Sequence, residues 1–151
     1  MSPEVRAIFE RLAELPLWLG VELQHVNACN ADGDNALHWV ARTGDVDAAK
    51  LLLAAGIEID KRGDLGHTPL HEAAAAGHKE MVLLLVEHGA DVFALTEGDT
   101  PFGLARALRQ DHICEILGPM MRAGRTPERF LELRIEHLKG ELRRLEGELA
   151  K

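Results

Sequence analysis

Short helical patterns of apolar residues dominate the chain. The first pattern starts at Ser2 and Pro3, a capping residue and a first-turn proline, and it ends near Pro16. Its apolar positions have helical spacing and comprise Val5, Ile8, Phe9 and Leu12. Residues 17–25 fit the pattern that follows poorly, and we interpret them as a degenerate second helix. The first helix is expected to cap the element that comes next.

The chain then repeats itself. A shift of 33 residues carries residues 35–59 onto residues 68–92. The coinciding pairs are Leu37/Leu70, His38/His71, Ala41/Ala74, Gly44/Gly77, Leu51/Leu84, Leu52/Leu85 and Gly56/Gly89. A third and weaker copy begins at Thr100, one residue early.

Each copy predicts two helices and a projecting hairpin. In the second copy Thr68 and Pro69 start a short alanine-rich helix, which Gly77 ends. A leucine-rich helix follows over residues 79–87 and stops at Gly89, after which a polar hairpin is expected. One such unit cannot bury its own apolar faces, whereas stacked units can.

The Thr-Pro-Leu-His start at residues 68–71 and the repeat length resemble the ankyrin repeat. The first copy has Asn-Ala in place of Thr-Pro, and in the third copy Gly103 replaces the histidine and Arg109 the glycine. The resemblance covers about residues 27–118. It implies an all-α ankyrin-repeat solenoid of about three repeats with helical caps. It also implies a concave face, made by hairpin tips and first helices, that binds a protein partner.

The last part of the chain has a different pattern. Gly118 and Pro119 are expected to end the third repeat, and a heptad pattern fills residues 127–151. Its seam positions, spaced 4, 3, 4, 3 and 4, are Leu131, Ile135, Leu138, Leu142, Leu145 and Leu149. A parallel homodimer would set like charges against each other, so antiparallel pairing, a different partner or packing on the third repeat remain open. We favour a role in assembly, because every seam position is Leu or Ile.

Charge follows the boundaries of these parts, which are a cap (residues 1–26), the repeats (27–121) and the C-terminal helix (122–151). Residues 1–121 hold 9 Lys and Arg against 19 Asp and Glu, a net charge of −10, whereas residues 122–151 hold 8 against 6, or +2. A negative surface repels phosphate and attracts cations. The sequence therefore argues against nucleic-acid binding and favours a protein partner with a basic surface.

Composition excludes several classes of protein. No apolar run reaches the roughly 18 residues that span a bilayer, and the N-terminal residues lack the apolar region of a secretory signal. Two cysteines, Cys29 and Cys114, are too few for a disulfide framework and suit a reducing compartment. We therefore expect a cytoplasmic protein that does not insert into membranes.

Candidate catalytic chemistry is sparse. His38 and His71 occupy equivalent positions, and the ankyrin resemblance implies that both form structural hydrogen bonds between repeats. The Cys and His spacings match no zinc site, and there is no phosphate-binding loop or nucleophile elbow. We expect no enzyme activity, no metal and no cofactor. The alternative is a small enzyme or ligand sensor that uses His67, His71 or the carboxylates.

The resemblance places a set of residues on the concave face, and these are the candidate contacts for a partner. They are Asp32, Asp34, Trp39, Arg42, Asp64, Leu65, His67, Glu72, Glu97 and Asp99. Trp39 is interpreted as an interface anchor, with packing against the N-terminal cap as the alternative. An acidic module of this kind would serve as an inhibitor or immunity-type protein, or as an adaptor.

Overall fold

The computed structural model describes residues 1–96, 98–123, 132, 135, 139 and 142–150. The labelled helices are α1 (Pro3–Ala13), α2 (Ala36–Thr43), α3 (Val46–Ala54), α4 (Pro69–Ala76), α5 (Lys79–Glu87), α6 (Pro101–Ala107) and α7 (Asp111–Arg122). Two short 3-10 helices, η1 (Pro16–Trp18) and η2 (Asp64–Gly66), lie between them, and residues 142–149 are also helical. Among the described residues the only β feature is one isolated bridge, between Cys29 and Asn35.

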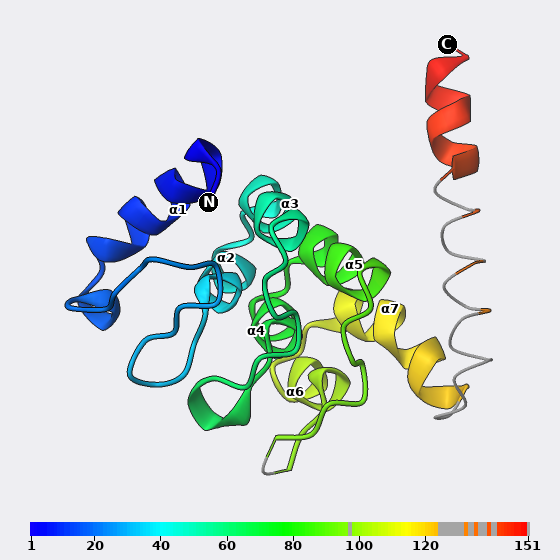
Figure 1. The fold of residues 1–151 in the computed structure, drawn as a ribbon. Coiled ribbons are helices and arrows are strands. Elements are labelled where there is room, and N and C mark those ends of the chain that lie inside the picture. Colours follow the sequence, from blue (N-terminus) through cyan, green and yellow to red (C-terminus); the bar gives the residue numbers. More distant parts are fainter. Residues whose placement is uncertain (97, 124–131, 133–134, 136–138, 140–141, 151) are drawn as a thin grey trace.

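The helices form two rows, which Figure 1 shows end-on near its centre. The inner row consists of α2, α4 and α6, each packed against the next, and the outer row consists of α1, α3, α5 and α7. Each inner helix also packs against an outer one, α2 against α3, α4 against α5 and α6 against α7. These pairs are the repeats, so the predicted all-α solenoid of about three repeats is confirmed.

Helix α1 takes the first place in the outer row and packs against α2 and α3. The hydroxyl of Ser2 accepts a hydrogen bond from the backbone N–H of Val5 at 3.3 Å, which caps the helix as expected. The apolar positions named for it are all buried, namely Val5, Ile8, Phe9 and Leu12. The expected N-terminal cap over the first repeat is therefore present.

Two expectations about the flanks are wrong. Residues 17–25 do not form a second helix, because the chain makes only a 3-10 turn at η1 and reverses at Gly20, which has φ 78°. This segment instead buries Trp18 in the core. Nor do Gly118 and Pro119 end the third repeat, since α7 continues through both as far as Arg122. Met120, which follows the proline, is buried and anchors the last turn of α7. This burial offsets the loss of the backbone hydrogen bond that proline cannot donate.

Glycines end the inner helices α2 and α4, as the first two copies of the repeat predict. Gly44 and Gly77 follow α2 and α4 with φ of 77° and 75°, in the left-handed region that other residues adopt at a cost. Gly56 and Gly89 have φ of 84° and 92° after the outer helices. No helix of the described residues is long and apolar enough to span a membrane.

Replacing Gly77 by valine is expected to lower the free energy of unfolding by about 1–3 kcal/mol, because valine is strained at positive φ. A Cβ atom there also meets the Gln110 side chain, whose Nε2 donates to the carbonyl of Ala75 at 3.0 Å. Gly56→Val is the matched control, since a Cβ atom at Gly56 meets open space and only the backbone strain remains. Urea unfolding measures both, and an unchanged Gly77→Val variant would contradict this account of the turn.

Candidate protein-binding site

The predicted concave face corresponds to a surface that we call the inner face. It comprises the exposed sides of α2, α4 and α6 together with three fingertips, defined as residues 30–34, 63–67 and 96–99. Figure 1 shows the three loops that carry them at one edge of the inner row. Glu97, one of the predicted contacts, lies outside the described residues.

Backbone and side-chain hydrogen bonds hold the first two fingertips in shape. In the first, the side-chain oxygen of Asn30 accepts from the N–H of Asp34 at 3.0 Å. In the second, the N–H of Gly63 donates to the carbonyl of His67 at 2.9 Å. The N–H of Asp64 donates to the Asp34 carboxylate at 3.0 Å, which ties the two fingertips together. The first two fingertips therefore form one connected surface.

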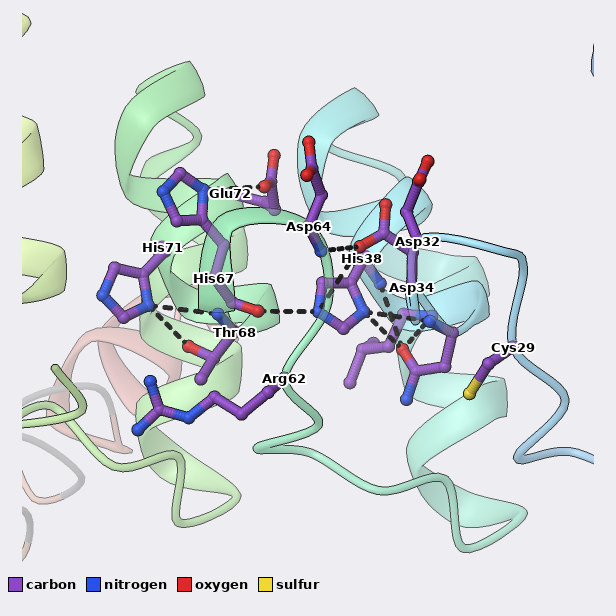
Figure 2. A network of polar contacts seen from close by, with 12 residues as sticks. Cys29, Asp32, Asp34, His38, Arg62, Asp64, His67, Thr68, His71 and Glu72 are labelled. Carbon is purple, nitrogen blue, oxygen red and sulfur yellow. Dashed lines mark hydrogen bonds and ion pairs between the residues drawn. The ribbon is translucent and has the colours of Figure 1, made fainter. Parts of the chain in front are cut away.

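His38 and His71 join each repeat to the fingertip of the next. Nε2 of His38 donates to the carbonyl of His67 at 3.0 Å (Figure 2), and Nε2 of His71 donates to the carbonyl of Asp99 at 3.2 Å. This tautomer follows because Nδ1 of each ring accepts a backbone N–H at 3.1 Å. The predicted structural hydrogen bonds between repeats are confirmed.

Both rings are neutral at pH 7. Burial lowers the pKa of His71 to about 4, although its hydrogen bond to the Asp99 carbonyl acts in the opposite direction. Burial also lowers the pKa of His38, against the effects of the His67 carbonyl and the Asp34 carboxylate. The two histidines thus belong to the framework that positions the fingertips.

A network of ion pairs occupies the middle of the inner face. Nε of Arg42 lies 2.8 Å from one oxygen of Glu72, and its Nη2 lies 3.6 Å from Asp34. Nδ1 of His67 lies 3.1 Å from the other oxygen of Glu72. Burial by itself would raise the pKa of Glu72, but the hydrogen bond and charge of Arg42, together with His67, hold it below its ordinary value.

This network also includes Asp34, which we placed among the candidate contacts for a partner. Asp34 is only 6% exposed, and its carboxylate serves the N–H of Asp64 and the guanidinium of Arg42. A buried acid needs such partners, so the position is structural. Sequence spacing could not show this, because Asp32 and Asp34 look alike in the sequence.

The remaining acids of the described fingertips lie at the surface. Asp32, Asp64 and Asp99 are exposed. Figure 2 draws the carboxylates of Asp32 and Asp64 on the same side of the polar network, turned away from the ring of His38. Leu65 lies beside Asp64 and is also exposed.

Trp39 lies partly buried on α2 and packs against the core. The guanidinium carbon of Arg11, on α1, lies 5.2 Å from the centre of its ring, and Arg11 also pairs with Asp45 at 3.4 Å. This contact with the N-terminal cap is the alternative that we left open for Trp39. The part of the ring that stays accessible remains a candidate contact.

Sequence reasoning missed a second set of bonds between repeats. The side-chain oxygen of Asn27 accepts from the N–H of Glu58 at 2.8 Å, and that of Asp60 accepts from the N–H of Asp91 at 2.9 Å. Burial raises the pKa of Asp60, since desolvation disfavours the charged form. The repeat length could have revealed the pair, because Asn27 and Asp60 are one period apart.

The part of the chain that the structure describes holds no cluster of metal ligands and no disulfide. There, no group of three or more His, Cys, Asp and Glu side chains could hold a metal ion. Cys29 and Cys114 are free and half-buried.

Comparison with known proteins points to one family of repeat proteins. Residues 7–96 and 64–123 match the family model described as ankyrin repeats (3 copies). The palmitoyltransferase ZDHHC13 of Homo sapiens is 40% identical over 85 residues, which cover 56% of this chain and 13% of that protein. The ankyrin repeat and KH domain-containing protein mask of Drosophila melanogaster is 39% identical over 75 residues, covering 49% and 2%. The neurogenic locus notch homolog protein 1 of Xenopus laevis is 34% identical over 102 residues, covering 66% and 4%.

The chain spans only 2% to 13% of the length of these relatives, so the similarity gives no indication of enzyme activity for it. The family match covers most of the chain and coincides with the two rows of helices and with the histidine hydrogen bonds. The chain belongs to the ankyrin repeat proteins, whose repeats form a module for protein–protein interaction.

Proposed function

We propose that the chain is a non-catalytic module that binds a protein partner with a basic surface through the acids of its inner face. The observation that carries the proposal is the contrast among those acids. Arg42 neutralises Asp34 and Glu72, whereas Asp32, Asp64 and Asp99 are exposed. A partner would therefore meet uncompensated negative charge at the fingertips.

A row of exposed acids at the fingertips raises the rate of association with a basic partner more than it raises the final affinity. Negative charge along one edge attracts a basic surface over about a Debye length, 8–10 Å at physiological salt, and repels anionic competitors. The net charge of −10 over residues 1–121 has the same sign. These properties support a role as an inhibitor or immunity-type protein of a basic enzyme, or as an adaptor. The two free cysteines suit action in a reducing compartment such as the cytoplasm.

The proposal is tested by replacing Asp32, Asp64 and Asp99 with asparagine and selecting binders from a phage-displayed library of random peptides. Wild type is expected to enrich peptides rich in Arg and Lys, with affinities that fall as salt rises. The triple variant should bind those peptides about tenfold more weakly, because three exposed charge pairs are each worth about 0.2–1 kcal/mol. Its binding should also depend less on salt.

The matched control removes the same charge from the outer row. Asp47, Glu80 and Glu115 are exposed on α3, α5 and α7, and their amide variants are expected to bind the peptides as wild type does. Equal losses in both triple variants would mean that net charge alone matters. Enrichment of peptides without basic residues would contradict the proposal.

We further propose that the C-terminal helix mediates assembly. Its described seam residues Ile135, Leu142, Leu145 and Leu149 are 50%, 56%, 49% and 88% exposed, so they are available to another chain. Leu131 and Leu138 lie outside the described residues.

A further inference from the structure

Leu65 is exposed to an unusual degree for an apolar residue in the repeats. It is 71% exposed at the tip of the second finger, within η2. Its backbone has φ 53° and ψ 18°, in the left-handed region that leucine rarely adopts. Strained residues that persist in a fold are held by their surroundings, and they concentrate at functional sites.

Backbone hydrogen bonds on both sides of Leu65 hold it in this conformation. The N–H of Gly66 donates to the carbonyl of Gly63 at 3.0 Å, and the N–H of His67 donates to the carbonyl of Asp64 at 2.9 Å. The fingertip is thus closed on both sides of Leu65 by its own backbone.

Arg62 adds a brace from outside the turn. Its Nη1 donates to the carbonyl of Gly66 at 3.0 Å and also to the carbonyl of Leu95, on the approach to the third fingertip. The backbone that carries Leu65 is therefore held in one conformation before any partner arrives, which reduces the entropy lost on binding.

The repeat alignment shows that the leucine is a local exception. Leu65 lies three residues before Thr68, the residue that precedes the inner helix of the second copy. The equivalent residue is Asp32 in the first copy and Glu97 in the third. Asp32 is exposed, as is Asp64, which lies next to Leu65. An apolar group thus stands in a row where the sequence otherwise places acids.

We propose that Leu65 is the apolar anchor of the inner face and that it selects a basic segment carrying an aliphatic or aromatic side chain. This proposal rests on the proposed function and adds a second requirement to it. Neighbouring helices of a row are about 8–10 Å apart, and an extended chain rises about 3.3 Å per residue. A cation opposite Asp32 therefore lies about three residues from the apolar side chain that meets Leu65.

The experiment uses the same random-peptide library on the full chain. Peptides selected by wild type are expected to carry Arg or Lys three positions from an aliphatic or aromatic residue. Leu65→Ala should bind these peptides about tenfold more weakly, as loss of a hot-spot side chain does. Leu19→Ala is the matched control, because Leu19 is 70% exposed on the N-terminal segment and its loss should leave the affinity unchanged.

A second variant separates binding from folding. Asparagine tolerates the left-handed region better than leucine does, so Leu65→Asn should leave the melting temperature unchanged or raise it by a few degrees, while binding falls. If Leu65→Asn binds the selected peptides as wild type does, the anchor assignment is wrong. Peptides that are basic but show no apolar requirement would overturn this proposal alone, and peptides that are not basic would overturn the proposed function as well.

Discussion

Replacing His71 by alanine is expected to lower the free energy of unfolding by about 3 kcal/mol at neutral pH. The ring is fully buried, and it accepts the N–H of Thr68 while donating to the carbonyl of Asp99. Its removal leaves the buried N–H of Thr68 without this partner and opens a cavity, whereas the carbonyl of Asp99 still accepts from Thr96. An unsatisfied buried donor costs about 1–3 kcal/mol, and the cavity adds to that loss.

The same residue makes stability depend on pH. The pKa of His71 is about 4 in the folded chain and near 6.5 when the chain is unfolded, so the unfolded chain binds a proton first as pH falls. The stabilisation is complete above pH 6.5 and is lost as pH falls from 6.5 towards 4. Between pH 7.5 and 5 we expect a loss of about 2 kcal/mol from His71. His38, whose pKa is also lowered, adds to this loss.

Two substitutions distinguish the two hydrogen bonds. The amide of His71→Asn can reach the place of Nδ1 and keep the bond to Thr68, whereas that of His71→Gln can reach the place of Nε2 and keep the bond to Asp99. Urea unfolding at pH 7.5 and 5 should show a smaller pH dependence in both variants than in wild type. If the variants keep the full pH dependence, the titration belongs to other groups.

The features that sequence reasoning predicted are those that depend on local backbone chemistry. Thr68 at the start of α4 and Gly77 at its end each satisfy a requirement of a single turn, so residue type alone reveals them. The structural role of the two histidines was implied by the resemblance to the ankyrin repeat, whose pattern both of them match one period apart. Their hydrogen bonds to the carbonyls of His67 and Asp99 give the physical reason.

The features that sequence reasoning missed depend on contacts between repeats. Asp34 is buried because Arg42, from α2, and the N–H of Asp64, from the next finger, reach it together. Pro119 stays within α7 because packing of Met120 outweighs a local preference against proline. A local sequence pattern cannot reveal contacts between residues that lie far apart in the chain. They matter for the candidate site because they decide which carboxylates stay free.

Deleting residues 127–151 is expected to abolish self-association while leaving the repeats folded. No described side chain of residues 142–150 is buried, so the repeats should lose little stability, within about 0.5 kcal/mol. The described seam residues, in contrast, expose apolar area that a second chain can cover. Light scattering and urea unfolding of the two proteins measure both effects.

A double substitution tests the seam without shortening the chain. Leu142→Glu with Leu145→Glu places charges on the exposed apolar face and should yield a monomer, because like charges would be buried against each other. Arg143→Ala with Arg144→Ala changes the same helix away from the seam and should leave the assembly intact. If the truncated chain instead loses several kcal/mol of stability, the helix packs on the third repeat, and its leucines complete the solenoid in place of joining two chains.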